Sequence, residues 1–329
     1  MIQLNFIAPP AAKDFCQAHD VASMDQQPSL FVNSTWAWVV QTVLVLREAG
    51  LDVTVAASAC PDSINFSLAN QLRELERSTN FFMVSMDADQ LRPRWANVAL
   101  VQNMTQAGRR AFWIPHWPQP GLIPRDPART SFERVGFFGL ERNLYRGKDW
   151  WDHLCARCGM EFNLQPRECW HDYHDVDIAL GIRDLQGRRH DEKPPTKLFN
   201  AWLAGCAFIA GNDSAYSQVG LRGRDFLYAK SEREVMACLE SLSGSPSKGQ
   251  ELVSQGRSRL QAIGSRENTR DRWIQLLERE LVPLYQRWRA QKTWRRELAL
   301  TSGLAADSLI RTRNSIWRHV KKRLRTRGH

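Results

Sequence analysis

The chain has 329 residues, of which 43% are hydrophobic, and a formal net charge of +10 at pH 7. Its length and its 13 Trp are enough for two domains with packed cores, which excludes a disordered protein. No stretch approaches the roughly 18 uncharged apolar residues of a membrane span, and we read no secretory signal at the start.

The positive charge is concentrated in the last 39 residues. Residues 291–329 hold 11 Lys and Arg against 2 Asp and Glu, whereas residues 1–290 hold 34 against 33. A nearly neutral body lacks the basic face of a nucleic-acid-binding domain, so we expect no nucleic-acid partner. Seven scattered Cys favour free thiols and a cytoplasmic protein.

Strands and helices alternate through residues 1–120. After a strand over 3–8, a polar loop reaches Asn33, and a helix begins at Ser34 and stops at Gly50. The further predicted elements are a strand over 51–57, a helix over 65–77, and strands over 81–87, 98–103 and 110–116. This order predicts a mostly parallel sheet covered by helices, an N-terminal Rossmann-like domain.

A second strand–helix pattern follows a proline-rich segment. Five prolines between Pro115 and Pro127 predict a hinge at 121–132; the alternative is a long surface loop within one domain. Beyond it we predict strands over 134–139, 160–165, 176–182, 207–211 and 225–229, helices over 147–159, 197–205, 214–220 and 235–242, and a loop over 244–250. The second domain then covers 133–266. A long helix over 267–290 and a basic amphipathic tail over 291–329, broken by a polar segment at 301–307, complete the chain.

A charged loop follows the predicted strand 176–182 and leads into a helix that starts after two prolines. In open α/β sheets, ligands bind at the carboxyl ends of the strands, where this loop lies. Free N–H groups and the positive end of the helix dipole suit a phosphate there. Lys197 in the first helical turn opposes that dipole unless an anion is bound. The alternative is a solvated basic loop with Lys197 facing water.

The segment from Lys193 to Tyr216 resembles the donor-binding motif of family 4-like glycosyltransferases of the GT-B fold. In that motif an acidic residue is followed eight positions later by a second one that opens a helix, and then by a glycine and a strand. Glu192 takes the first position and Asn200 the second. Ala201, Ala204, Gly205, Phe208 and Ile209 match the rest, whereas Cys206 and Ala207 stand where the family has proline.

The resemblance implies a role for each of these positions. Glu192 would accept hydrogen bonds from the transferred sugar, and Asn200 would face the ribose. Residues 134–150 resemble the first strand and phosphate loop of the same domain, where Gly139 would admit the diphosphate and Arg142 or Arg146 would neutralise it. The expected donor site comprises Gly139, Arg142, Arg183, Glu192, Lys197 and Asn200.

The fold class implied is α/β, with two Rossmann-like domains facing each other across a cleft. The reaction implied is transfer from a nucleotide-sugar donor to a glycan, lipid-linked or other acceptor, with no metal or other cofactor, because basic groups and a helix N-terminus stabilise the leaving diphosphate. We expect Trp36, Asp87 and His116 on the acceptor side; Asp87 or His116 would be the base if the reaction inverts.

Three other interpretations remain open. One is a non-catalytic or epimerase-like relative that binds nucleotide sugar or glycan. Another is a metal-dependent GT-A enzyme that uses Asp87 and Asp89, since paired aspartates after a strand bind a divalent ion. The third is a structural zinc site among residues 153–174, which supply His153, Cys155, Cys158, Cys169, His171 and His174. Cys155 and Cys158 fall in an amphipathic helix, which favours buried thiols instead.

The tail is the last feature with a predicted partner. Residues 309–327 combine apolar positions, Trp317 and basic residues in a helical pattern. Such a helix suits an anionic membrane surface, which would make the protein peripheral at the inner membrane face. Contact with nucleic acid and an inert terminus are the alternatives.

Overall fold

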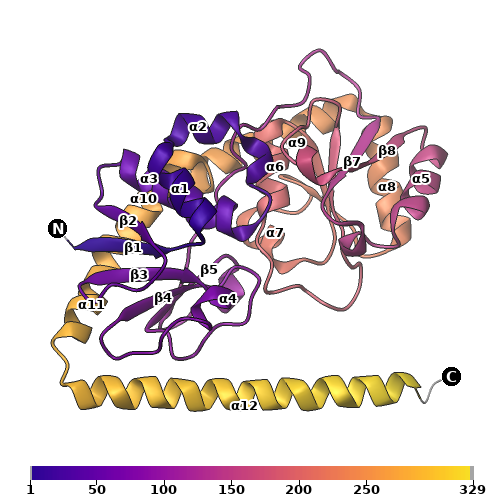
Figure 1. Ribbon diagram of the computed structural model, residues 1–329. Helices are drawn as coiled ribbons and strands as arrows, with labels where there is room; N and C mark the ends of the chain where they lie inside the picture. Colours follow the sequence, from indigo (N-terminus) through magenta and orange to yellow (C-terminus); the bar gives the residue numbers. More distant parts are fainter. Residues whose placement is uncertain (1, 327–329) are drawn as a thin grey trace.

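The structure, a computed structural model, describes the backbone of residues 2–326 and the side chains of residues 2–313. It has two α/β domains, each built on its own parallel sheet, as Figure 1 shows. The two predicted α/β halves are therefore both present. Methionine 1 and residues 327–329 lie outside the described part, as do the side chain of Trp317 and the end of the tail segment 309–327.

The N-terminal sheet has six strands in the order β2-β1-β3-β4-β5-β6, all parallel. The strands are β1 Gln3–Ile7, β2 Val53–Ala56, β3 Ser63–Leu68, β4 Phe82–Met86, β5 Val98–Val101 and β6 Ala111–Trp113. The helices and helical turns are α1 Pro10–Ala18, α2 Val21–Gln26, η1 Pro28–Leu30, η2 Thr35–Val40, α3 Gln41–Glu48, α4 Ala69–Leu72 and η3 Met104–Gln106. Because β3 and β4 are buried along their whole length, they form the centre of this domain.

Two predictions in this domain are wrong. In the segment predicted as a helix over 65–77, strand β3 continues to Leu68, the short helix α4 covers only Ala69–Leu72, and turns follow. Ser63, Asn65 and Ser67 alternate with apolar residues there, and the Asn65 side chain bonds to Asn5 and Cys60, so polar residues are satisfied inside a buried strand. The loop predicted up to Asn33 contains α1 and α2, whose apolar residues Phe15 and Met24 complete the core.

The second sheet has five parallel strands in the order β11-β10-β9-β7-β8. They are β7 Arg134–Phe138, β8 Glu161–Gln165, β9 Ile178–Gly181, β10 Ala207–Ala210 and β11 Leu227–Tyr228. The helices and turns are η4 Glu141–Asn143, α5 Lys148–Arg157, η5 Arg167–Cys169, α6 Thr196–Ala204, α7 Ser214–Val219, α8 Glu232–Ser243 and α9 Pro246–Ile263. Separate apolar clusters cover the two faces of the sheet.

Local signals account for most of these boundaries. Gly205 ends α6 with a φ of +79°, a conformation that favours glycine. Ser231 caps α8 by accepting a hydrogen bond from the Glu234 N–H, as the capping-box pattern predicts. The loop predicted over 244–250 is wrong, because Pro246 is tolerated in the first turn of α9 and Gly249 packs closely on the Phe132 ring.

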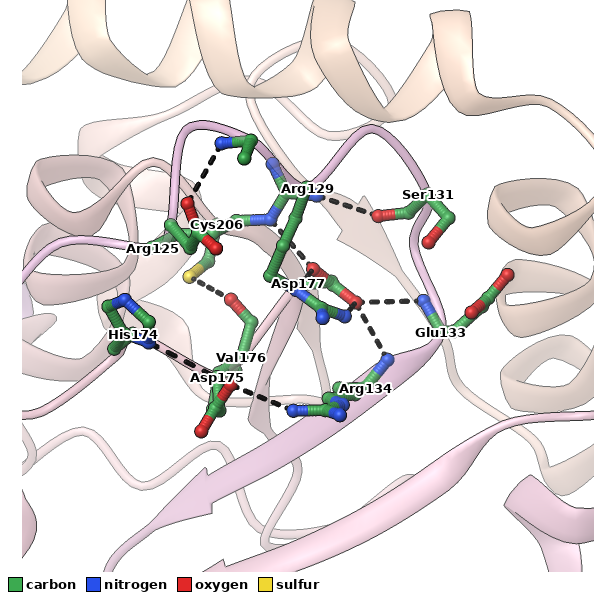
Figure 2. A network of polar contacts seen from close by, with 12 residues as sticks. Arg125, Arg129, Ser131, Glu133, Arg134, His174, Asp175, Val176, Asp177 and Cys206 are labelled. Atoms are coloured by element: carbon green, nitrogen blue, oxygen red, sulfur yellow. Dashed lines mark hydrogen bonds and ion pairs between the residues drawn. The ribbon is translucent and has the colours of Figure 1, made fainter.

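The proline-rich linker is fixed to the second domain by a buried carboxylate, Asp177, just before β9. Figure 2 shows Arg125 and Arg129 converging on it. Arg125 Nε lies 2.8 Å from Oδ1, Arg129 Nη2 lies 2.6 Å from Oδ2, and the N–H groups of Glu133 and Arg134 donate to Oδ2 at 3.0 and 2.9 Å. Because Asp177 is fully buried, these contacts hold the linker against the base of the second sheet.

After α9 the chain returns to the N-terminal domain. Helix α10 Arg266–Leu276, the π-helical turn η6 Leu277–Leu281 and α11 Val282–Arg289 nearly match the long helix predicted over 267–290. Trp273 packs edge-on against Phe66, and Tyr285 and Trp288 both pack against Phe82. These aromatic residues belong to the core of the first domain, so the segment is part of that domain in space.

The basic tail forms one helix, α12 Thr293–Thr326, drawn in yellow in Figure 1. The polar break predicted at 301–307 does not interrupt it. Leu300 and Leu304 pack on Trp95 and its apolar neighbours, and Asp307 accepts a hydrogen bond of 2.8 Å from the Arg94 N–H. Between residues 2 and 326, none of the helices is both long enough and apolar enough to cross a membrane.

Gly303 allows α12 to approach the N-terminal domain. A Cβ at this position would lie 2.5 Å from Trp95 Cα and 2.7 Å from the Arg94 carbonyl oxygen, both backbone atoms that cannot move independently. We expect Gly303→Val to destabilise the protein by about 1–3 kcal/mol, as overpacking does. Urea denaturation measures this change, and Ser302→Val, at an exposed neighbouring position, is the control that should change little. Equal stability of the two variants would contradict the close packing.

Candidate donor site between the domains

A cavity of about 280 Å³ lies between the two domains, at the carboxyl ends of both sheets. Residues that follow β4, β5 and β6 contribute Ala88, Asp89, Gln102 and His116. Residues that follow β7 and β9 contribute Gly139, Leu140 and Arg183 from the opposite side. The first turn of α6 closes one wall with Thr196, Lys197 and Asn200. This is the position at which open parallel sheets bind ligands.

Lys197 is a half-buried lysine in the lining of this cavity. Its Nζ donates a hydrogen bond to the Phe138 carbonyl oxygen and lies 4.3 Å from the centre of the Phe137 ring. Burial and the nearby Arg183 hold its pKa well below the usual range, although Asp213 acts in the opposite direction. An anion in the cavity would reverse this shift, because it favours the charged amine.

Arg183 is held in place by Asp213, the residue before α7. Arg183 Nε lies 3.0 Å from Asp213 Oδ2, and the carboxylate is 1% exposed. Burial raises the pKa of Asp213, but Arg183 counteracts it. The other oxygen, Oδ1, is buried and has no hydrogen-bond partner among the described residues. The guanidinium is therefore oriented toward the cavity by a fixed ion pair.

The first turn of α6 presents backbone donors to the same place. Leu198 and Phe199 donate their N–H groups to the Pro195 carbonyl, which leaves those of Thr196 and Lys197 without a partner within the helix. Gly139 lies opposite, and a Cβ there would stand 2.5 Å from Lys197 Nζ. The glycine thus leaves room for the Lys197 amine beside the end of β7, at the edge of the cavity.

Asn200 joins the helix to the proline-rich segment. Its Oδ1 accepts a hydrogen bond of 3.1 Å from the Gln119 N–H. Tyr173 is stacked on Phe138 with ring centres 3.7 Å apart. This pair forms an aromatic wall in the cavity lining that the sequence patterns did not reveal.

Two predicted donor-site residues lie outside the cavity lining. Arg142, in η4, is exposed to solvent, and Asn143 faces the cavity in its place. Glu192 forms an ion pair of 2.9 Å with Arg188, four residues earlier, and lies 3.8 Å from His190. Arg146, the alternative to Arg142, pairs with Glu232 at 3.1 Å.

Of the residues expected on the acceptor side, His116 lies in the cavity lining and Trp36 lies outside it. His116 lines the cavity, and burial lowers its pKa to about 4, although the hydrogen bond from Nδ1 to the Trp117 carbonyl opposes this shift. The imidazole is therefore neutral at pH 7, with Nε2 free of a proton, as a general base requires. Trp36 instead packs edge-on against Phe15 and Phe31.

The paired aspartates do not form a metal site. Asp87 is buried and accepts hydrogen bonds from Ser85 and Arg92, at 2.6 and 2.8 Å, whereas Asp89 pairs with Lys193 at 2.6 Å. Ala88 between them has a φ of +47°, and each carboxylate is matched by its own cation. The two-domain architecture also contradicts the GT-A alternative.

The proposed zinc ligands are not assembled either. Within residues 2–326, no three His, Cys, Asp or Glu side chains are grouped closely enough to hold one metal ion. Cys155 is buried in α5, and burial raises its pKa to about 12, which disfavours the thiolate that zinc requires.

A set of contacts across the cleft was not predicted. Asn103, after β5, donates from Nδ2 to the Lys193 carbonyl and to Ser214 Oγ, each at 3.0 Å, and its Oδ1 accepts from Gln218 at 2.9 Å. The Asp89–Lys193 ion pair lies beside it. These contacts tie the charged loop 183–196 to the N-terminal domain. Asn103 lies two residues after the end of the buried strand β5, and a polar residue at this edge of the sheet is the signal that the sequence offers.

Comparisons with known proteins agree with this geometry. Residues 126–278 match the protein-family model described as Glycosyl transferase-like. No curated protein sequence matches the chain at a significant level. The family match covers the end of the linker, the whole second sheet and the start of the segment that returns to the first domain.

Several solved structures share the fold at low sequence identity. Sucrose-phosphate synthase from Thermosynechococcus elongatus has a TM-score of 0.55 and 11% identity, covering 86% of this chain and 100% of that chain. HepE from Anabaena, in complex with UDP and glucose, has a TM-score of 0.52 and 9% identity, covering 84% and 100%. TarM matches 66% of this chain with a TM-score of 0.46 and 12% identity, and this chain spans 55% of the length of TarM; the fold assignment rests on the first two structures. The chain therefore has the GT-B fold, and its residues 126–278 are similar to the glycosyl transferase-like family, whereas the family 4-like detail of the resemblance stays a prediction.

Proposed function

We propose that the protein transfers a sugar from a nucleoside-diphosphate sugar, bound between the domains, to a glycan or lipid-linked acceptor. The observation that carries this proposal is the convergence of Lys197, Arg183 and the free N–H groups of α6 on one interdomain cavity beside Gly139. Three kinds of donor are thus preorganised where the diphosphate of a departing nucleotide would gain negative charge.

The same arrangement supports a reaction without a metal. Lys197 and Arg183 supply positive charge, and the α6 N-terminus adds its dipole, so the leaving diphosphate can be stabilised by the protein alone. On the other side of the cavity, His116 is the group best placed to take a proton from an acceptor if the reaction inverts. Seven thiols without disulfides support a cytoplasmic location.

A ligand screen tests the donor. HepE is described with UDP and glucose, so UDP and UDP-glucose are the first compounds to try, followed by the other nucleoside diphosphates and their sugars. We expect the matching diphosphate to raise the melting temperature of the full chain, because it binds only the folded state. Inorganic sulfate is the control for unspecific anion binding. A screen without any stabilising nucleotide would contradict the proposal.

A second candidate is a protein that binds the donor or a glycan without transferring sugar. It is favoured by Asn200 at the second motif position and by the pairing of Glu192 with Arg188, away from the cavity lining. Hydrolysis or transfer of a bound nucleotide sugar, followed by release of the diphosphate, distinguishes the two. A glycan-binding module would also keep its glycan in Lys197→Ala, whereas a transferase would lose turnover of the donor.

A further inference from the structure

Helix α12 has two different faces. Arg296, Leu300, Gly303, Leu304 and Asp307 contact the N-terminal domain. Trp294, Leu298 and Leu309 are 54%, 61% and 73% exposed, although they are large and apolar. At about 100° of rotation per residue, these three side chains fall within a sector of about 60°, roughly opposite the contacting residues. We call Trp294, Leu298 and Leu309 the outer face of α12.

The exposed apolar side chains of the outer face indicate a binding partner that covers them. The segment that carries it, residues 291–329, has 11 basic and 2 acidic residues, while the rest of the chain is nearly neutral. Exposed Arg295 and Arg313 flank the outer face, each about 100° around the helix axis from Trp294, and the Arg295 guanidinium lies 5.2 Å from the centre of the Trp294 ring. Apolar side chains with basic neighbours match the two layers of an anionic membrane, its acyl chains and its headgroups.

We infer that the outer face of α12 binds the surface of a membrane that contains anionic lipids. Tryptophan and leucine enter the interface between headgroups and acyl chains, and the basic residues contact lipid phosphates. The helix lies along the surface without crossing it. Because the opposite side of α12 holds the N-terminal domain through Gly303 and Asp307, attachment fixes the orientation of that domain, the expected acceptor side, toward the membrane.

Two other occupants fit the observations less well. A nucleic acid would match the charge, but it offers no apolar partner for three exposed large side chains. A second copy of the chain could cover the apolar residues. It would, however, bring together two segments that each carry a charge of +9, and like charges repel.

Vesicle sedimentation with the full chain tests the inference. We expect binding to vesicles of phosphatidylcholine mixed with phosphatidylglycerol, and weak binding to phosphatidylcholine alone. Leu298→Gln combined with Leu309→Gln removes apolar surface without changing charge, and it should lower the partition coefficient about tenfold or more. The matched control is Leu91→Gln combined with Leu221→Gln, which replaces two leucines that are 43% and 52% exposed elsewhere. The control should bind like the wild type.

A second pair of substitutions separates charge from apolar contact. Arg295→Gln combined with Arg313→Gln should weaken binding to anionic vesicles, and the difference from the wild type should shrink as added salt screens the lipid charge. Equal vesicle binding by the Leu298/Leu309 variant and the wild type would overturn the inference. So would tight DNA binding by a wild type that binds no anionic vesicles, or a wild-type dimer in sedimentation equilibrium that the Leu298/Leu309 variant dissociates.

Discussion

Asp177→Asn should destabilise the protein by about 3–5 kcal/mol, the usual cost of removing one partner from a buried ion pair. Asp177 is fully buried and receives Arg125, Arg129 and two backbone N–H groups. The amide leaves Arg125, whose side chain is 6% exposed, without its countercharge. Urea denaturation measures the loss. Asp175→Asn is the matched control, since Asp175 is 66% exposed in its pair with Arg134 and should change stability by less than about 1 kcal/mol.

The pH dependence of this difference gives a second check. Burial opposes the charge on Asp177, but hydrogen bonds from Arg129, the two N–H groups and Arg125 outweigh it and lower its pKa. The unfolded value is about 3.9, so the stabilisation is fully present above that pH and is lost as pH falls through the lower folded value. The gap between wild type and Asp177→Asn should therefore narrow below about pH 4. If the difference in unfolding free energy between the wild type and Asp177→Asn stayed constant below pH 4, the ion pair would not be the cause of that difference.

Lys197→Met should lower kcat/KM for the nucleotide-sugar donor by about 10²–10³, as loss of one preorganised charge at a leaving group does. Folding should survive, because methionine fills the half-buried position without an amine to desolvate. Steady-state kinetics measure the first effect and thermal unfolding the second. Arg142→Met is the matched control. Its side chain is exposed outside the cavity lining, so we expect a small change in kcat/KM.

Proton uptake distinguishes direct contact with the anion from a structural role of Lys197. Its pKa is held well below the usual range in the free protein, and a bound diphosphate should raise it. Between the lowered value and about 10.4, binding of the nucleoside diphosphate should therefore take up a proton in the wild type but not in Lys197→Met. Calorimetry in two buffers of different ionisation enthalpy detects this uptake. Identical proton uptake by both proteins would exclude Lys197 as the group that meets the anion.

The position of the cavity could be predicted from the sequence, because ligands of open parallel sheets bind at the carboxyl ends of the strands. Arg183 and Lys197 follow a buried strand, and His116 follows another, so both sets reach a carboxyl edge whatever the details of packing. The sequence could not show which side chains turn toward the cavity. Glu192 and Arg142 occupy positions that the family pattern assigns to the donor site. The orientation of the Glu192 carboxylate, however, is set by its ion pair with Arg188, and the Arg142 side chain is exposed to solvent.

Long-range partners account for the features that were missed. Asp177 receives Arg125 and Arg129 from 52 and 48 positions earlier, a separation at which no periodicity links donor to acceptor. The same is true of Asn103 and Ser214, which are 111 positions apart. The prediction of a helix over 65–77 fails for the same reason. The polar side chain of Asn65 in β3 forms a hydrogen bond with Asn5 in the neighbouring strand β1, and a local sequence pattern does not show such a partner.

The return of α10 and α11 to the first sheet has a consequence for biosynthesis. Trp273, Tyr285 and Trp288 complete the core around Phe66 and Phe82, yet the ribosome makes them only after the entire second sheet. During synthesis, the N-terminal domain therefore exposes part of its apolar core until the second domain has been made. A chain that ends before residue 266 should therefore bind chaperones and aggregate. A chain in which a flexible linker joins residues 1–120 to residues 266–313 should fold, because it contains the complete apolar core of the first domain.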